Sequence, residues 1–211
     1  MVWTVYVLSP VLIHLVISEG VTFFAGDILD SAACTALSAF LVLPAVIWMY
    51  RQETDLRLAG NSKHETYKKE KHLGCYAVCF LSGGLLNVIW SGVLFGLGIS
   101  SAFSNQTQEA LLGSQMAAQI TGPGILVPIS EELVFRGLVY ERMKTRLSVR
   151  WAVFFSSLLF ALYHGNPIQM IYAFPMALLL ALLCERGGSL SEPILFHMGA
   201  NLTAIVFSLL S

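Results

Sequence analysis

The chain has 211 residues, of which 56% are hydrophobic and 12% are charged, and its mean hydropathy is +0.71. A soluble globular domain carries roughly 25% charged residues, so this composition excludes that class and indicates a membrane protein. The formal net charge of −1 does not favour an acidic or a basic partner.

Apolar stretches of about 20 residues predict an all-α, polytopic transmembrane helix bundle of about seven spans. They are expected at about 2–26, 33–50, 74–99, 115–141, 150–164, 167–185 and 189–211. The first stretch lacks a basic region before it and a small-x-small cleavage site, so we interpret it as a retained helix rather than a signal peptide. Gly122-Pro123-Gly124 and Pro128 predict interruptions of the fourth span, which neighbouring helices or a wet cavity can accommodate.

The placement of basic residues predicts the topology, because Lys and Arg gather in cytoplasmic loops. Eleven of the 12 lie in segments 51–73 and 142–150 or at Arg186, whereas the alternate connections contain none. The N-terminus is therefore expected in the cytoplasm and the C-terminus outside. The basic run at 67–71 is short and mixed with acids, so we expect contact with anionic lipid headgroups and no nucleic-acid binding.

The first polar motif is Glu131-Glu132-x-x-x-Arg136. A charge at the bilayer centre costs roughly 2.5 to 3.5 kcal/mol, so such residues normally pair or take part in function. Glu132 precedes Arg136 by four residues, which favours an ion pair within the helix. Glu131 is turned by about 100° and has no partner in its own helix, which makes it a candidate general base. The alternative is that both acids only hold Arg136 in a packing network.

Two further motifs follow, Phe160-x-x-x-His164 and His197-x-x-x-Asn201. His164 ends a span before a Gly-Asn-Pro helix stop, where a capping role is the alternative to catalysis, and Phe160 one turn earlier is expected to pack. His197 and Asn201 share one helix face and can point at the same ligand atom. Their alternative role is hydrogen bonding between helices.

The three motifs lie at similar depths. Counted at about 1.5 Å per residue from the cytoplasmic ends of their helices, Glu131, His164 and His197 are roughly 12 to 21 Å into the membrane. A carboxylate, two imidazoles and an amide in one cavity can activate water and stabilise an oxyanion. These are the requirements of acyl-transfer hydrolysis.

In this order, over about 115–211, the motifs resemble the CPBP (or Abi) family of intramembrane proteases, which includes CAAX prenyl endopeptidases and proteins linked to bacteriocin processing and self-immunity. We expect one transmembrane domain over 1–211, with variable helices at 1–110 and the catalytic core at 115–211. The resemblance implies that Glu132 and Arg136 support the site, and we add Phe160 to them as a packing residue.

The resemblance also implies that Glu131 and His164 activate the attacking water, while His197 and Asn201 hold the oxyanion. A zinc ion bound by Glu131, His164 and His197 is chemically possible. We prefer a mechanism without metal or other cofactor, since there is no His-Glu-x-x-His helix and Asn201 suits an oxyanion better than zinc.

The function expected from these residues is intramembrane proteolysis of a membrane-associated peptide or protein. The alternatives are a non-catalytic self-immunity or scaffold protein and, third, a proton-coupled transporter, because buried Glu and His also form proton relays. We expect a bacterial plasma membrane and a cavity open to the cytoplasm. A bacteriocin leader, pheromone or membrane regulator is preferred to a prenylated substrate, and no oligomeric state is predicted.

Overall fold

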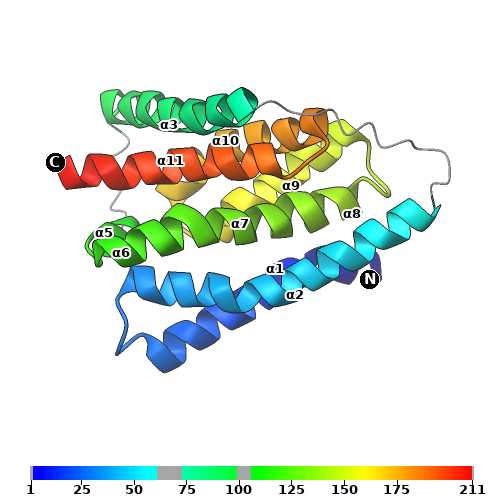
Figure 1. Ribbon diagram of the computed structural model, residues 1–211, viewed down its shortest axis with the longest axis horizontal. Coiled ribbons are helices and arrows are strands. Elements are labelled where there is room, and N and C mark those ends of the chain that lie inside the picture. The colour runs from blue at the N-terminus through cyan, green and yellow to red at the C-terminus, as the bar shows by residue number, and fades with distance from the viewer. Residues whose placement is uncertain (1, 61–72, 99–105, 211) are drawn as a thin grey trace.

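The computed structural model describes residues 2–60, 73–98 and 106–210, and the elements in these ranges are helical (Figure 1). In chain order they are α1 (Val2–Ala25), α2 (Ser31–Gly60), α3 (Leu73–Gly96), α5 (Gln106–Leu112), α6 (Met116–Gln119), η1 (Ile120–Leu126), α7 (Val127–Glu132), η2 (Leu133–Tyr140), α8 (Glu141–Met143), α9 (Val149–Tyr163), α10 (Pro167–Gly187) and α11 (Ser191–Leu210). The predicted all-α polytopic bundle is confirmed.

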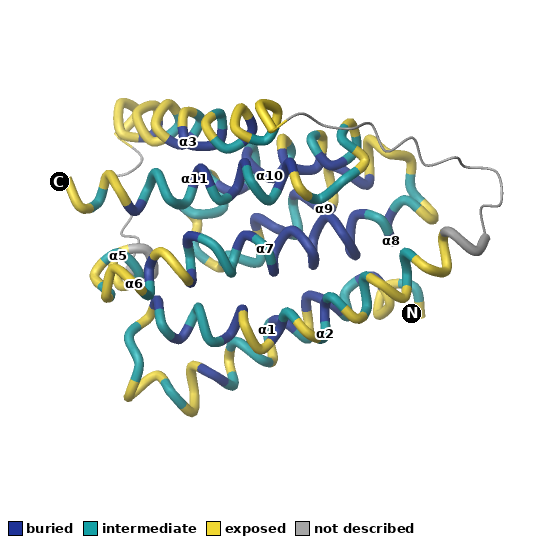
Figure 2. The backbone as a smooth tube through the Cα atoms, in the orientation of Figure 1, coloured by how far each residue is buried: buried dark blue, intermediate teal, exposed yellow. Residues whose placement is uncertain are grey.

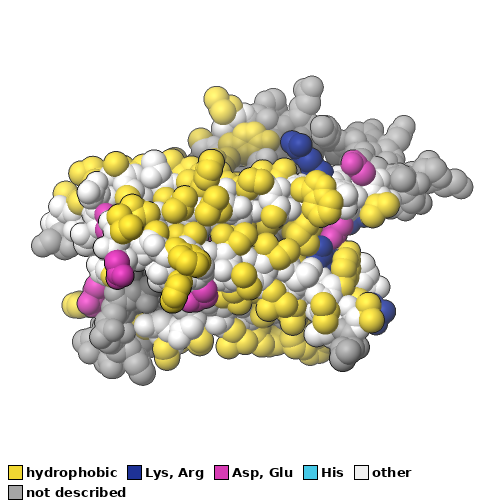
Figure 3. All heavy atoms as spheres, turned by 90° about the horizontal axis from the view of Figure 1, so that it is seen from below, with side chains coloured by type: hydrophobic (Ala, Val, Ile, Leu, Met, Phe, Trp, Pro, Cys, Tyr) yellow, Lys and Arg dark blue, Asp and Glu magenta, His cyan; other side chains and the backbone are white. Residues whose placement is uncertain are grey.

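Within the described ranges, five helices are long and apolar enough to cross a membrane: α1, α2, α3, α10 and α11. The shorter apolar helix α9 and the continuous helical run from α6 to α8 correspond to the other two predicted spans. Hydrophobic side chains cover most of the face in Figure 3, as expected for contact with lipid. The chain is an integral, multi-pass membrane protein.

Helix α2 is longer than predicted, because it continues past residue 50 to Gly60. The polar C-terminal end of α2 remains helical because its charged side chains form ion pairs with residues of α8. Arg57 Nη1 lies 2.9 Å from Glu141 Oε2, and Arg142 Nη2 lies 2.5 Å from Glu53 Oε1. A second difference is the short helix α5, which lies where the sequence predicted a connection. The basic residues that the topology prediction also used, Lys63, Lys68, Lys69 and Lys71, lie outside the described residues.

The helical run from α6 to α8 contains two π-helical segments, η1 and η2, one on each side of α7. The interruption predicted at Gly122-Pro123-Gly124 is therefore a widened helix and not a break. Proline has no N–H and its ring clashes with the carbonyl four residues earlier, and the wider turn relieves this conflict. Val127 N–H then donates to the carbonyl of Gly122, five residues back. Such segments are frequent at functional sites.

The core lies along η2, all eight residues of which are buried. Figure 2 shows this stretch as the darkest part of the helical run, covered by the other helices. Helix α11 packs along α3 at very short range (Figure 1). A Cβ on Gly83 would lie 1.9 Å from the Phe196 carbonyl oxygen, and one on Gly199 would lie 1.9 Å from that of Phe80. The absence of a side chain at Gly199 thus permits the close approach of the two helices.

Candidate active site

The centre of the polar cluster is Glu132, which is fully buried. Its Oε1 accepts a hydrogen bond from Arg136 Nη1 at 2.9 Å and lies 2.9 Å from His197 Nδ1. Because an ionised carboxylate can only accept, His197 Nδ1 must carry a proton. Arg136 Nη2 also donates to the carbonyl of Ala177 at 3.1 Å. The cluster therefore connects α7, η2, α10 and α11.

Glu131 lies near the other nitrogen of the same imidazole, Nε2 of His197. Glu131 Oε2 lies 3.8 Å from His197 Nε2, and both side chains are buried. With a neutral imidazole, two carboxylates and one guanidinium would leave an uncompensated negative charge, which is costly in a buried site. A proton shared between Glu131 and His197 Nε2 would neutralise this charge, so the pair is a candidate for proton transfer.

Phe160 connects His164 to this cluster. The Phe160 ring is buried, with the Arg136 guanidinium 4.5 Å from its centroid and the ring centroids of His164 and His197 at 4.8 and 6.0 Å. His164 follows the last turn of α9, and its Nδ1 lies 2.9 Å from the Phe160 carbonyl oxygen. Since a carbonyl accepts, His164 Nδ1 donates, and Nε2 keeps its lone pair in the neutral ring. His164 thus has the form of a proton acceptor.

Asn201 lies one turn after His197 on α11, but the two side chains have different partners. Asn201 Nδ2 donates to the carbonyl of Pro123 in η1 at 2.8 Å, whereas His197 is held by the two acids. Different groups therefore hold the two side chains in this structure. The amide of Asn201 has a second N–H that remains available as a donor.

The structure brings some predicted residues into direct contact and leaves others apart. Glu132, Arg136 and His197 are hydrogen-bonded, Glu131 is adjacent, and His164 joins them through Phe160. In the part of the chain that the structure describes, no three His, Cys, Asp or Glu side chains are grouped as metal ligands. Glu131, His164 and His197, the ligands considered for zinc from the sequence, do not form such a group in this arrangement of the described residues.

Two residues that the sequence analysis passed over lie beside the site. The Tyr163 hydroxyl is 2.7 Å from His14 Nδ1, and His14 is buried in α1. The carboxylate of Glu131 interacts electrostatically with both side chains. The available signal was a histidine in the middle of the first apolar span, where polar residues are rare and usually functional.

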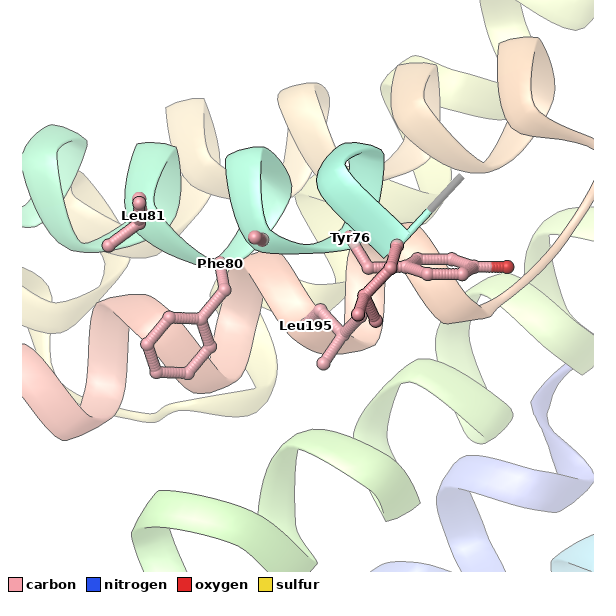
Figure 4. Close-up of a pocket in the computed structure, with 6 residues that line it drawn as sticks. Tyr76, Phe80, Leu81 and Leu195 are labelled. Carbon is pink, nitrogen blue, oxygen red and sulfur yellow. The ribbon is translucent and has the colours of Figure 1, made fainter. Parts of the chain in front are cut away.

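A separate apolar hollow of about 480 Å³ lies between α3 and α11 (Figure 4). Its lining residues are Leu73, Tyr76, Ala77, Phe80, Leu81 and Leu195. None of them belongs to the polar cluster, and hydrophobic walls supply no group that could activate water. The cluster around Glu132 is therefore the candidate active site, and this hollow is not.

The polar cluster lies in a part of the chain that matches a known family. Residues 113–203 match the model of the family described as type II CAAX prenyl endopeptidase Rce1-like. This region is Rce1-like. For this region, the resemblance to CAAX-type membrane proteases that the three motifs predicted is confirmed. No curated protein and no solved structure matches the chain. The matched region includes every predicted site residue and Tyr163, whereas His14 lies outside it.

Proposed function

We propose that this protein is an intramembrane endopeptidase that hydrolyses a peptide bond of a membrane-associated substrate. The observation that carries the proposal is the buried imidazole of His197, which lies between Glu131 and Glu132, with Arg136 paired to Glu132. A cluster of this kind is an expensive way to stabilise a bundle, but it holds a mobile proton in a low-dielectric site. The Rce1-like match supports proteolysis as the reaction class.

In the proposed first step, Glu131 accepts a proton from a water molecule as the water oxygen attacks the scissile carbonyl carbon. His164 Nε2 is the second acceptor that helps to orient this water. The C=O π electrons move to oxygen, and the oxyanion accepts hydrogen bonds from the protonated Nε2 of His197 and the second N–H of Asn201. The proton on Glu131 then passes to the leaving nitrogen, the C–N bond breaks, and a carboxylic acid and an amine are released.

In this scheme Glu132 is a positioning residue. Its bond to His197 Nδ1 sets the orientation of the imidazole, and its ion pair with Arg136 compensates its own charge. The mechanism that we propose uses no metal ion. Nδ1 bonds to a carboxylate and to a carbonyl would suit a metal ligand equally well, so the preference rests on Asn201, whose amide suits an oxyanion better than zinc.

For the substrate, the family description names prenyl endopeptidases, so a lipid-anchored peptide is the class to test first. We propose that the anchor brings the scissile bond to the membrane depth of Glu131. A farnesylated peptide with a CAAX-type end is one probe, and a membrane-anchored peptide library without a prenyl group is the other. Their comparison separates a prenyl requirement from membrane association alone.

The decisive test compares Glu131→Gln with wild-type protein purified in detergent and reconstituted into vesicles. Loss of the base should lower the cleavage rate by about 100-fold or more, with little change in the melting temperature. Glu185→Gln is the matched control, because Glu185 pairs with Lys144 away from the cluster, and it should cleave normally. Activity of Glu131→Gln within a few-fold of wild type would contradict the proposal.

Two further outcomes of the same assay separate the alternatives. Exhaustive treatment with a zinc chelator should leave the rate unchanged, whereas loss on chelation and recovery with zinc would establish a metalloprotease. If folded wild-type protein cleaves neither probe set, the non-catalytic immunity or scaffold function replaces the proteolytic one.

A further inference from the structure

The first helix places a histidine beside the catalytic cluster. His14 lies about 18 Å along α1 from Val2, close to the depth of Glu131, which is about 16 Å from Arg142 along its own helix. The His14 side chain is buried, and its ring meets that of Tyr163 edge to face with centroids 5.4 Å apart. Tyr163 directly precedes His164 in sequence, so α1 contacts the end of α9 that carries the second motif.

The hydrogen bonds determine which nitrogen of His14 carries the proton. The hydroxyls of Tyr163 and Ser18 lie 2.7 and 3.3 Å from Nδ1, and both can donate to it. With Nδ1 as the acceptor, the neutral ring carries its proton on Nε2. This Nε2 is buried and has no hydrogen-bond partner among the described residues. A buried N–H without an acceptor is unfavourable unless water or a ligand meets it.

We propose that His14 is a further catalytic residue, supplied by α1 from outside the Rce1-like region, whose Nε2–H binds the attacking water beside Glu131. The water oxygen accepts from His14 while one of its O–H groups donates to the Glu131 carboxylate, which leaves a lone pair for the scissile carbonyl carbon. Tyr163 is a positioning residue that sets the rotation of the imidazole. This inference rests on the proposed proteolytic function.

The electrostatic environment agrees with this role. The carboxylate of Glu131 acts through space on both His14 and Tyr163. The competing explanation is structural, namely that the bond from Tyr163 to Nδ1 only fastens α1 to α9.

Two substitutions of His14 distinguish these explanations, because they preserve different nitrogens. The amide of His14→Asn replaces Nδ1 and can keep the bond to Tyr163, whereas that of His14→Gln reaches the position of Nε2 and can supply its N–H. If His14 binds the water, the Asn variant should lose about 100-fold in kcat, with KM changed less than about threefold. The Gln variant should retain kcat within about 10-fold of wild type.

A purely structural role predicts the opposite order, with Asn the better replacement, and that result would overturn the proposal. Tyr163→Phe provides a second measurement should a His14 variant not fold. It should lower kcat several-fold at unchanged KM, and an unaltered kcat would equally overturn the proposal. Tyr172→Phe is its matched control, because Tyr172 donates to Asn87 between α10 and α3, and its kcat should be unchanged.

The assay uses the full chain with whichever probe the wild type cleaves. If wild type cleaves and Glu131→Gln does not, a normal rate for His14→Asn removes His14 alone from the mechanism. If wild-type protein cleaves no probe, the proposed function fails and the role of His14 fails with it.

Discussion

At the scale of single residues, Glu132 bonds to two side chains, of which the sequence predicted only one. Its spacing from Arg136 predicted the ion pair, which is present at 2.9 Å. The same oxygen also holds His197 Nδ1 at 2.9 Å, so the supporting pair is continuous with the proposed oxyanion donor. A change in either partner of Glu132 should therefore affect both folding and the orientation of His197.

Arg136→Ala should destabilise the protein severely, because it leaves Glu132 buried without its cation at a cost of about 3 to 5 kcal/mol. Thermal unfolding in detergent measures this loss. Arg57→Ala is the control, since the Arg57 side chain is 40% exposed and its surface ion pairs contribute at most about 1 kcal/mol. An Arg136→Ala protein as stable as wild type but inactive would move Arg136 from support into the chemistry.

At the scale of helices, the site depends on two departures from ordinary α-helix packing. The π-helical segment η1 precedes the helix with the two acids, and the Pro123 carbonyl within it accepts from Asn201. The second departure is the packing of α11, which lies so close to α3 that the two backbones are in contact at Gly83 and Gly199. This contact fixes the rotation of α11 and hence the direction of His197.

Gly83→Ala should therefore impair both stability and catalysis. The new Cβ would meet the Phe196 carbonyl oxygen at 1.9 Å, so the helices must separate, at a cost of about 1 to 3 kcal/mol or more. Gly92→Ala on the same helix is the matched control. A Cβ there has nothing within 4 Å, and alanine favours a helix over glycine by about 1 kcal/mol. Equal melting temperatures for the two variants would contradict the close α3 and α11 contact.

At the scale of the whole molecule, charge is separated between the two ends of the bundle. Arg57, Arg142 and Lys144 lie in ion pairs at the end where α2 and α8 finish, which is also the end of the N-terminus (Figure 1). At the opposite end Asp30 accepts from the backbone N–H groups of Ala33 and Gln115. Those N–H bonds hold the pKa of Asp30 below its usual value, so that end stays anionic at neutral pH. From the positive-inside rule we expect the N-terminus in the cytoplasm.

The topology can be measured with single cysteines in a background lacking Cys34, Cys75, Cys79 and Cys184. Cysteines placed in the 142–150 and 186–191 segments should react with an impermeant thiol reagent only from the cytoplasmic side. A cysteine at Asp27, in the connection between α1 and α2, should react only from the outside. Labelling in the reverse pattern would invert the protein, and substrate would then enter the cavity from the opposite side.

The sequence by itself determined the properties that depend on local order along the chain. Apolar length predicted the spans, basic residues predicted their alternation, and the spacing of Glu132 and Arg136 predicted their pair, because each is set by neighbours within a few turns. The three motifs also predicted the Rce1-like relationship, which the family match confirms.

Only the tertiary structure decided how helix faces meet. The contacts of His197 with Glu132 and of His14 with Tyr163 join residues 65 and 149 positions apart, and their geometry depends on how each helix is rotated. A π turn inserts one residue, which turns the following side chains by about 100° relative to a regular α-helix. Helical periodicity read from the sequence cannot follow that shift. For this reason the partners of Asn201 and the contact of His14 with Tyr163 emerged only from the packed bundle.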